Sequence, residues 1–568
     1  MGQGQDLGVA FDGGLGYSVS TGVGPADREI GTRFEASAMT ENALTRRQFV
    51  GGSLAASLLA GMQVESRAEG DADGAKYRLF WGDLHNHNEV GYALGSLERS
   101  IENARGHLDF FAFTGHASWH DMPKMPGDRH MKWVCGFEVH RDHWPKTRQL
   151  IREANTDRFT ALLGYEWHSS RFGDYCMLFP EDQPELFLPD HVDKLLDFAE
   201  ARGALAIPHH VAYKQGWRGA NFDHFRPTAS PIVEIFSEHG LSESDVGPYP
   251  YIRHSMSGRS TANTIERQLL RGLRFGFVAS SDSHRGYPGA YGEGIVGVWA
   301  GDLSPGSLFK AMRARRTYAA TGDRIVLDVA LNGRPMGAEL AAVSDREIDV
   351  RVRGEDAISL VELVRNGRVI DRHFPDDHAD RPLSLPGRAK CRIQYGWGPW
   401  AALDLGHTCV WDMTIRIDGG RFLRAIPCFQ SAPLEEDLRD KLRVVSPKEI
   451  HLQSYTSRVK CFAEDPTKSL VFELEGGPDA ELSVELRSPT EQVARARLAD
   501  LVEENVVTFT GVFTSESHII HRLVGPSEYS ADVRFHDRRP AEQGPDWYYV
   551  RVTQKNGQMA WSSPIWVG

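Results

Sequence analysis

The stretch FWGDLHNH, residues 80–87, decides the fold. The residues before the histidines are typical of a short buried strand, and two histidines, His85 and His87, stand at its end. In an extended chain, residues two apart point to the same side. Both imidazoles can therefore bind one metal ion from a single strand end, so the stretch predicts a strand that delivers metal ligands.

Four further polar motifs follow apolar, strand-like runs in the same way. They are Thr114-Gly115-His116, Gly164-Tyr165-Glu166, Ile207-Pro208-His209-His210 and Ser281-Asp282-Ser283-His284. In a β/α barrel the carboxyl ends of the strands meet at one mouth. Histidine and carboxylate together favour zinc, manganese or iron. The ligands exceed the four that one zinc accepts, so the motifs predict two or three divalent ions.

The pattern of predicted secondary structure changes near Gly322. From about residue 76 to residue 323, short apolar strands alternate with helical stretches, which favours parallel strands joined by helical crossovers. Afterwards, alternating strands and the hairpin signals Asn332-Gly333 and Asn366-Gly367 take over. The predicted class is α/β, followed by a β-sandwich region, one sandwich or two small ones, over residues 324–568.

The N-terminal segment carries an export signature. Arg46-Arg47 precede a mildly apolar stretch over residues 51–62, and the small residues Ser66 and Ala68, two apart, suit cleavage near Ala68. We interpret residues 39–68 as a twin-arginine export signal and predict a periplasmic or secreted protein. A chance arginine pair before a short helix is the alternative. Residues 1–38 are Gly-rich, and we expect either a disordered segment or a true start at Met39.

Composition limits the partners. The chain has 568 residues, too many for one core, so two or three domains are expected. Its net charge of −13 argues against nucleic-acid binding, although a metal site can still hold an anionic substrate. No run of eighteen apolar residues occurs, so we expect no membrane span in the mature protein. The six cysteines form no CxxC motif, and neither their pairing nor the oligomeric state follows from the sequence.

The ordered set His-x-His, Thr-x-His, Glu, His and Asp-x-His resembles the PHP superfamily, named for polymerase and histidinol phosphatase, and within it a secreted branch of unknown function. The resemblance covers residues 76–323 and the following segment 332–337. It implies a distorted (β/α)7 barrel with a hydrolytic centre of two or three metal ions. The ligands that it implies are His85, His87, His116, Glu166 as a bridge between ions, His209, Asp282 and His284.

Three positions depart from the family's pattern. Gly115 replaces the aspartate of its Thr-Asp-His motif, which weakens the support of the ligands. His210 stands where the family has a proline. A further family histidine falls in an interval that offers His168, Asp174 and His191. We favour Asp174 as the additional ligand because it leads into an apolar strand; a plain turn residue beside a glycine is an equal alternative.

Other polar residues near the expected mouth are candidates for chemistry. His210 and His239 are candidates to protonate a leaving group, and Arg285 to hold an anionic oxygen. The alternatives are a solvated loop for His239 and a surface ion pair for Arg285. Glu234 lies within a predicted strand, where it either orients a metal-bound histidine or pairs with an arginine.

These residues support three hypotheses about function. The first is a metal-dependent hydrolase of anionic phosphoesters, in which a hydroxide bridging two cations attacks in line. The second is hydrolysis of a carboxylic ester, amide or lactone at the same centre. The third is a non-catalytic, metal-stabilised binding module. Arginines around the mouth would favour the first hypothesis and an apolar mouth the second. Five tryptophans keep both open: Trp119, Trp133, Trp144, Trp167 and Trp217.

Overall fold

The computed structural model describes residues 64–68, 76–247, 249–375, 383–397, 408–435, 438–457, 467–512, 515–541 and 544–568. The arginine pair Arg46-Arg47, residues 1–38 and nearly all of the predicted export signal lie outside the described residues. Within the described ranges, no helix combines the length and the apolar character that a membrane crossing requires.

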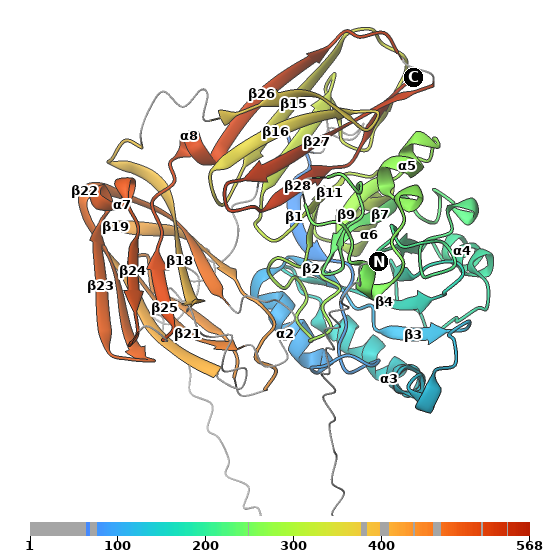
Figure 1. Ribbon diagram of the computed structural model, residues 1–568, viewed down its shortest axis with the longest axis horizontal. Helices are drawn as coiled ribbons and strands as arrows, with labels where there is room; N and C mark the ends of the chain where they lie inside the picture. Colours follow the sequence, from blue (N-terminus) through green and yellow to red (C-terminus); the bar gives the residue numbers. More distant parts are fainter. Residues whose placement is uncertain are drawn as a thin grey trace, which may run out of the picture. The chain divides into compact units, whose positions relative to one another are not determined.

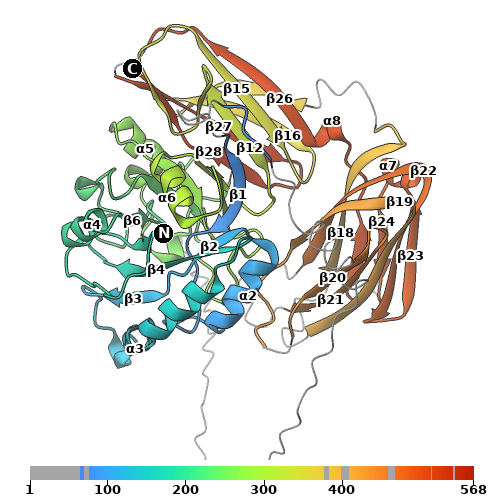
Figure 2. The ribbon, with the colours of Figure 1, turned by 180° about the vertical axis from the view of Figure 1, so that it is seen from behind.

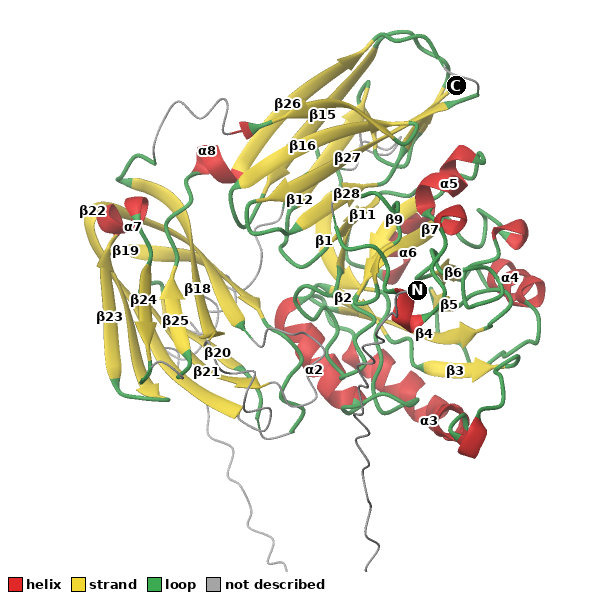
Figure 3. Ribbon diagram, viewed as in Figure 1, coloured by secondary structure: helices red, strands yellow, loops and turns green. Residues whose placement is uncertain are grey.

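The first part of the described chain is mixed α/β (Figure 3). Its helices are α2 (Leu97–His107), α3 (Met131–Ala154), α4 (Val192–Ala201), α5 (Ile265–Leu270) and α6 (Pro305–Arg313). Its strands are β1 (Arg78–Asp83), β2 (Phe110–Ala112), β3 (His116–Trp119), β4 (Thr160–His168), β5 (Tyr175–Phe179), β6 (Leu205–Pro208), β7 (Ile232–Ser237), β8 (Gly240–Leu241), β9 (Gly276–Ala279), β10 (Ile295–Ala300) and β11 (Thr317–Ala320).

Local chemistry sets the helix starts. The Ser96 side chain accepts a hydrogen bond from Arg99 N at the start of α2, and Ser304 does the same for Ser307 N at the start of α6. Pro305 occupies the first turn of α6, where its missing N–H costs nothing. α2 and α6 thus begin where a serine side chain caps the helix, whereas α3 and α5 begin without a side-chain cap.

Parallel and antiparallel strands mix around the site. β1, β2 and β4 run parallel, and so do β7 and β9. β5 lies antiparallel between β4 and β6, and β10 is antiparallel to β1. The expectation of parallel strands is therefore wrong for β5 and β10. For β5 the reason is the short connection 169–174, since a parallel crossover needs a dozen or more residues.

The ends of β1 and β9 are joined directly. Asn86 forms a parallel bridge with Ser283. His87 N donates to Ser283 O at 2.8 Å, and Asp282 N donates to His85 O at 2.7 Å. These backbone bonds bring the first and the last ligand motif of the sequence side by side, although about 195 residues separate them in the chain.

The chain after residue 324 is rich in strands (Figures 1 and 2). They are β12 (Val326–Leu331), β13 (Arg334–Pro335), β14 (Glu339–Leu340), β15 (Arg346–Arg353), β16 (Ile358–Arg365), β17 (Arg368–His373), β18 (Gly387–Trp397), β19 (Thr408–Cys428), β20 (Lys441–Ser446), β21 (Glu449–Ser457), β22 (Lys468–Ser488), β23 (Gln492–Arg497), β24 (Val506–Phe509), β25 (Ser517–Ile520), β26 (Ser530–Asp537), β27 (Asp546–Gln554), β28 (Met559–Ser562) and β29 (Ile565–Val567), with the short helices α7 (Leu498–Glu503) and α8 (Pro526–Tyr529).

Both predicted hairpins are present. Asn332-Gly333 connects β12 to β13, and Asn366-Gly367 connects β16 to β17. All four turn residues have positive φ, from +47° to +79°. This is the conformation that a two-residue turn of this kind requires, and asparagine and glycine adopt it at least cost. The hairpin prediction is confirmed at both places.

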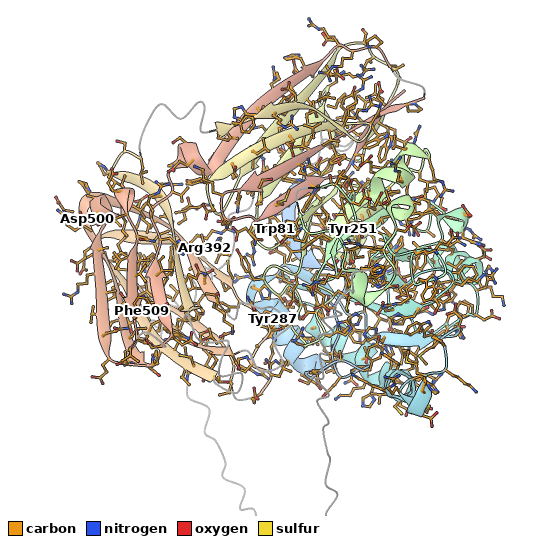
Figure 4. All side chains as sticks on the ribbon, viewed as in Figure 1. Trp81, Tyr251, Tyr287, Arg392, Asp500 and Phe509 are labelled. Atoms are coloured by element: carbon orange, nitrogen blue, oxygen red, sulfur yellow. The ribbon has the colours of Figure 1, made fainter. Side chains whose placement is uncertain are left out.

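The strands after residue 324 belong to three sheets: two that they form by themselves, and the sheet of β1, which β14, β16, β17, β27, β28 and β29 join. β13, β12, β15 and β26 form a four-stranded sheet, and β18 to β25 form an eight-stranded one. Val352 of β15 and Val550 of β27 belong to the same apolar core cluster as Trp81 of β1. Trp81, labelled in Figure 4, is 6% exposed. Its ring centroid is 5.6 Å from that of Tyr318. The eight-stranded sheet has a separate core cluster, which includes Trp411.

The last strands return to the sheet that carries the site. β28 pairs with β11, and β27 pairs with β28 and β16 (Figure 1). Three donors converge on the buried carboxylate of Glu243, which follows β8: Tyr549 Oη at 2.5 Å, Arg551 Nη1 at 2.9 Å and Trp561 Nε1 at 3.0 Å. One sheet therefore continues across the boundary predicted at residues 323 and 324.

Candidate metal centre

The predicted ligands lie at or next to strand ends, and all except His284 are buried. The side chain of His284 is 30% exposed. Their places in the fold are as follows: His85 and His87 follow β1, His116 begins β3, Glu166 is near the end of β4, Asp174 precedes β5, His209 follows β6, and Asp282 and His284 follow β9.

Glu166 lies between two groups of histidines. Its Oε1 is 2.6 Å from His209 Nε2. Its Oε2 is 2.6 Å from His116 Nδ1, 3.2 Å from His168 Nε2 and 3.5 Å from His87 Nε2. A carboxylate whose two oxygens face different histidines can bridge two ions, which is the role that the family resemblance implies for Glu166.

Asp282 is a second carboxylate on which several histidines converge. Its Oδ1 is 3.0 Å from His87 Nε2 and 3.2 Å from His85 Nε2, and its Oδ2 is 2.9 Å from His239 Nε2. The φ of Asp282 is +55°, a left-handed conformation that is uncommon outside glycine. His210, with φ +34°, is another non-glycine residue of the cluster in this region. Such backbone strain collects at functional sites.

Ring nitrogens face one another across the cluster. His85 Nε2 and His87 Nε2 are 3.0 Å apart, and His116 Nε2 and His284 Nε2 are 3.1 Å apart. Nitrogens bound to one zinc ion at about 2.1 Å would be about 3.4 Å apart in a tetrahedron. Glu166 Oε2 accepts no hydrogen bond, although His116 Nδ1 is 2.6 Å away. Converging lone pairs and an unbonded buried carboxylate oxygen fit divalent cations.

The donor atoms form overlapping groups. Three of these groups are His85 with His87 and Asp282, His87 with His116 and His284, and His116 with Glu166 and His168. Each group has its ligand atoms within 4.8 Å of one another. Since His87 and His116 each belong to two of the three groups, the arrangement has room for more than one ion.

Glu234 fixes the orientation of His85. The buried Glu234 on β7 accepts a hydrogen bond from His85 Nδ1 at 3.0 Å. This leaves the lone pair of His85 Nε2 directed at the cluster, as in the carboxylate–histidine pairs that support metal sites. Of the two roles considered for Glu234, the structure places it in the first, beside a site histidine. His284 is oriented similarly, by a bond from Nδ1 to Asp282 O at 2.8 Å.

Burial and charge set the protonation of the cluster. Burial, with help from His284, lowers the pKa of His87 to about 3. Burial also lowers the pKa of His116 well below its usual value. It would raise the pKa of Glu166 and Asp282, but the facing histidines outweigh it, and both pKa values lie well below the ordinary range. Acidic neighbours outweigh burial at His85 and His209: the pKa of His85 is raised well above its usual value, and that of His209 is raised to about 10. Because neutral imidazoles and ionised carboxylates are the forms that bind metal, these two histidines must release a proton when an ion binds.

Asp174 lies at the edge of the cluster. Its carboxylate belongs to a further group of donor atoms within 4.8 Å of one another, with Glu166, His209 and His210. Its Oδ2 is 3.1 Å from His168 Nδ1, and it accepts bonds from Arg218 Nη2 and Nε at 2.7 and 3.0 Å. His168 therefore stands between Asp174 and Glu166. Sequence reasoning passed over His168, yet a signal was present, because His168 follows Glu166 by two residues on β4 and shares its face. His191 caps α4, where its Nδ1 accepts from Asp193 N at 3.2 Å, away from the cluster.

The three predicted catalytic residues are all buried. His239 is 4% exposed and bonded on both sides, to Asp282 and, at 2.8 Å, to Tyr213 Oη, so the solvated-loop alternative is wrong. His210 Nε2 is 3.4 Å from Asp174 Oδ2. Arg285 is 6% exposed, so it is no surface residue, and its Nη1 is 3.7 Å from Glu238 Oε2.

Some neighbours of the cluster had no signal in the sequence. The Tyr92 ring stacks on His116 with 3.7 Å between centroids and an angle of 3°. Cys176 Sγ is 3.7 Å from His209 Nδ1. Both come from segments without a motif, and only the fold brings them to the site. Among the described residues Cys176 is a free thiol, as are four other cysteines.

The five tryptophans have three kinds of surroundings. Trp119 and Trp133 line the cluster, with ring centroids 6.2 Å apart and the Trp119 ring 5.7 Å from His168. Trp217 is 64% exposed in the loop after β6. Trp144 and Trp167 are buried in the core, where their indoles donate to backbone oxygens. An aromatic rim is therefore present on one side of the cluster.

Comparison with known proteins gives distant relatives. No protein-family model matches the chain. An uncharacterized protein of Chlamydia trachomatis serovar D is 27% identical over 340 residues, which are 52% of this chain and 49% of that protein. A similarly uncharacterized protein of Chlamydia pneumoniae is 26% identical over 327 residues, 53% and 49% of the two chains. The chain thus spans about half the length of the curated relatives it matches.

Two solved structures are similar in part. One is a two-domain protein from Bacteroides vulgatus containing a predicted PHP-like metal-dependent phosphoesterase, with a TM-score of 0.31, 14% identity, and coverage of 54% of this chain and 83% of that one. The other is Endonuclease Q in complex with a duplex carrying an abasic lesion, with a TM-score of 0.26, 14% identity, and coverage of 41% and 56%. Likenesses this weak assign neither fold nor activity to this chain.

Proposed function

We propose that the chain is a metal-dependent hydrolase that acts on small anionic phosphoesters. The observation that carries the proposal is the position of Glu166, whose Oε1 faces His209 and whose Oε2 faces His116, both at 2.6 Å. Divalent ions held there would supply an activated water and would neutralise charge that develops on the substrate. The donor set suits zinc, manganese or iron, and two or three ions.

The chain's own residues have distinct tasks in this proposal. Glu166 and Asp282 hold the ions together with the histidines around them. Glu234 keeps the Nδ1 proton of His85 in place, so that His85 Nε2 stays a lone-pair donor. His239 has both ring nitrogens engaged, whereas His210 Nδ1 has no hydrogen-bond partner among the described residues. We therefore keep His210 as the candidate that exchanges a proton with the leaving group.

The finer predictions on fold and location belong to the same proposal. We propose that residues 76–323 form a distorted (β/α)7 barrel of the PHP type, which the parallel pairs β1–β2–β4 and β7–β9 and the bridge from Asn86 to Ser283 support. We propose β-sandwiches for the sheets after residue 324. We also propose export by the twin-arginine route, and with it a periplasmic or secreted location, from Arg46-Arg47, the mildly apolar stretch 51–62 and the expected cleavage near Ala68.

The proposal is tested on purified full-length protein. Elemental analysis should find at least about two equivalents of zinc, manganese or iron per chain. A screen should find hydrolysis of aryl phosphates faster than that of aryl carboxylic esters. Faster ester hydrolysis would favour the second hypothesis, and bound metal without any hydrolysis would favour the non-catalytic module. Absence of bound metal, after reconstitution with each ion, would contradict all three.

A further inference from the structure

Arg218 brings a positive charge to the edge of the metal centre. It lies in the loop between β6 and β7, and its Nη2 and Nε donate to Asp174 Oδ2 at 2.7 and 3.0 Å. Nη2 is also 3.3 Å from His210 Nε2. The side chain of Arg218 is 22% exposed. One edge of the guanidinium is therefore anchored at the cluster while part of the group stays open to solvent.

Three segments hold the guanidinium still. Its central carbon lies 5.4 Å above the Trp119 ring. Trp119 Nε1 donates to Ser170 Oγ at 3.0 Å, and Arg218 N donates to Ser170 O at 3.0 Å. The end of β3, the connection 169–174 and the loop after β6 are thus linked around one side chain. A charge fixed in this way needs no reorganisation when a ligand arrives.

The backbone of Arg218 is strained. Its φ is +67°, in the left-handed region that favours glycine. The following residue must be glycine, because a Cβ at Gly219 would lie 1.8 Å from Tyr213 O. The loop therefore turns tightly at this point and places Arg218 over the site. Strain maintained by this many contacts is a mark of functional residues.

The guanidinium keeps unused donors. Its hydrogen bonds to described residues are made by Nε and Nη2, which leaves Nη1 for a ligand. The negative charge of Asp174 is shared between Arg218 and His168, because its Oδ2 also lies 3.1 Å from His168 Nδ1. Arginine presents its donors in a planar fork that matches phosphate oxygens. Arg285, which the sequence suggested for this role, is more deeply buried and faces Glu238.

We propose that Arg218 forms an anion subsite that binds a phosphoryl oxygen of the substrate beside the metal centre. The proposal rests on the proposed function and deepens it, because it names the residue that selects charged phosphoesters over neutral carboxylic esters. Asp174 is then a positioning residue that holds Arg218, and no covalent step is assigned to either residue.

The test compares two substrates with one leaving group, 4-nitrophenyl phosphate and 4-nitrophenyl acetate. In the metal-loaded protein, Arg218→Met should lower kcat/KM for the phosphate at least about 30-fold, mostly through KM, since a charged hydrogen bond is lost. Its kcat/KM for the acetate and its metal content should stay near the wild-type values. Binding of methylphosphonate, measured by calorimetry, should weaken at least about tenfold.

Arg315→Met is the matched control. Arg315 also has a positive φ, +58°, is 18% exposed, pairs with Glu339 at 2.8 Å and lies 5.0 Å over the Trp566 ring. It is outside the metal centre, so its loss should leave both substrates and methylphosphonate unaffected. Arg218→Lys, which keeps the charge without the fork, should fall between wild type and Arg218→Met.

The outcomes separate the subsite from the function. Equal losses on phosphate and acetate in Arg218→Met, with metal retained, would overturn the subsite, and so would an unchanged phosphate reaction. Loss of metal from Arg218→Met and Arg218→Lys alike would also overturn it, because Arg218 would then support the ligands. If the wild-type protein hydrolyses neither substrate, the proposed function fails, and methylphosphonate decides: binding that Arg218→Met abolishes supports the subsite, and absence of binding overturns it.

Discussion

The α/β part and the eight-stranded sheet each bury histidines, with opposite surroundings. His87, at the end of β1, meets Asp282 at 3.0 Å and Glu166 at 3.5 Å. His518, on β25, is fully buried, and neither ring nitrogen has a hydrogen-bond partner among the described residues. Burial lowers the pKa of both, to about 3 for His87 and about 4 for His518. Burial alone therefore does not distinguish a ligand; convergent carboxylates and imidazoles do.

The same contrast extends to the two cores. Apolar side chains pack around Trp411 on the eight-stranded sheet, and the burial of their surface away from water stabilises the sheet. Around Glu166 the α/β part buries several charged or ionisable groups, which cost free energy unless they are paired or bound to metal. The α/β part is thus expected to depend on metal for stability, whereas the eight-stranded sheet is not.

The largest effect is expected from the bridging carboxylate. Glu166→Gln should lose metal and at least about 100-fold in turnover, because several kcal/mol of charge stabilisation disappear. Asp282→Asn should behave similarly. The control is His518→Gln, which changes a buried residue of the other region and should keep its metal. Full metal content and full activity in Glu166→Gln would eliminate this site.

Removal of metal should separate the two regions. Dialysis against a chelator should speed amide hydrogen exchange in segments 82–87, 114–118 and 280–284. The reason is that an ion whose free concentration is about 1,000 times its Kd stabilises the folded protein by roughly 4 kcal/mol, and dialysis removes this contribution. Exchange in β19, β21 and β22 should remain slow. Equal acceleration in both regions would mean that the metal, if present, is not confined to the α/β part.

Three residues in the interval after Glu166 allow a finer comparison. His168→Ala should weaken metal binding at least about tenfold, since its Nε2 lies 3.2 Å from Glu166 Oε2. Asp174→Asn should leave metal content nearer to normal but should lower phosphate hydrolysis through Arg218. His191→Ala, at the cap of α4, should bind metal normally. Metal titrations of the three variants measure their metal affinities. If His191→Ala lost as much affinity as His168→Ala, the assignment of His168 to the metal centre and of His191 to the cap of α4 would be contradicted.

The smallest effect on the metal centre is expected from a change where the C-terminal strands meet the α/β part. Glu243→Ala leaves Tyr549 Oη and Trp561 Nε1 buried without their acceptor, at a cost of about 1–3 kcal/mol each. Urea unfolding should report this loss, while the metal content of the folded protein stays unchanged. An unchanged free energy of unfolding would mean that these strands do not stabilise the α/β part.

The sequence predicts the site better than the sheet that carries it. His85, His87, His116, Glu166, His209, Asp282 and His284 could be found because each follows or ends an apolar run, and the fold brings their side chains together. The direction of β5 could not be found, because it depends on the short connection 169–174 and leaves no trace in apolar periodicity.

Other features depend on contacts between distant segments. The position of Arg218 over Trp119 and Asp174 arises from three loops, which periodicity does not register. The pairing of β28 with β11 joins residues about 240 apart in the chain. Conversely, the two Asn-Gly hairpins were predictable, because a two-residue turn with positive φ is a local property.

Anomalous diffraction from crystals of the full-length protein, collected at the zinc, manganese and iron absorption edges, tests the central claim most directly. We expect at least two peaks within about 2.0–2.3 Å of side-chain atoms of Glu166, Asp282 and the histidines around them, with Glu166 touching two peaks. Absence of any peak in this cluster, in crystals grown with each metal, would contradict the account.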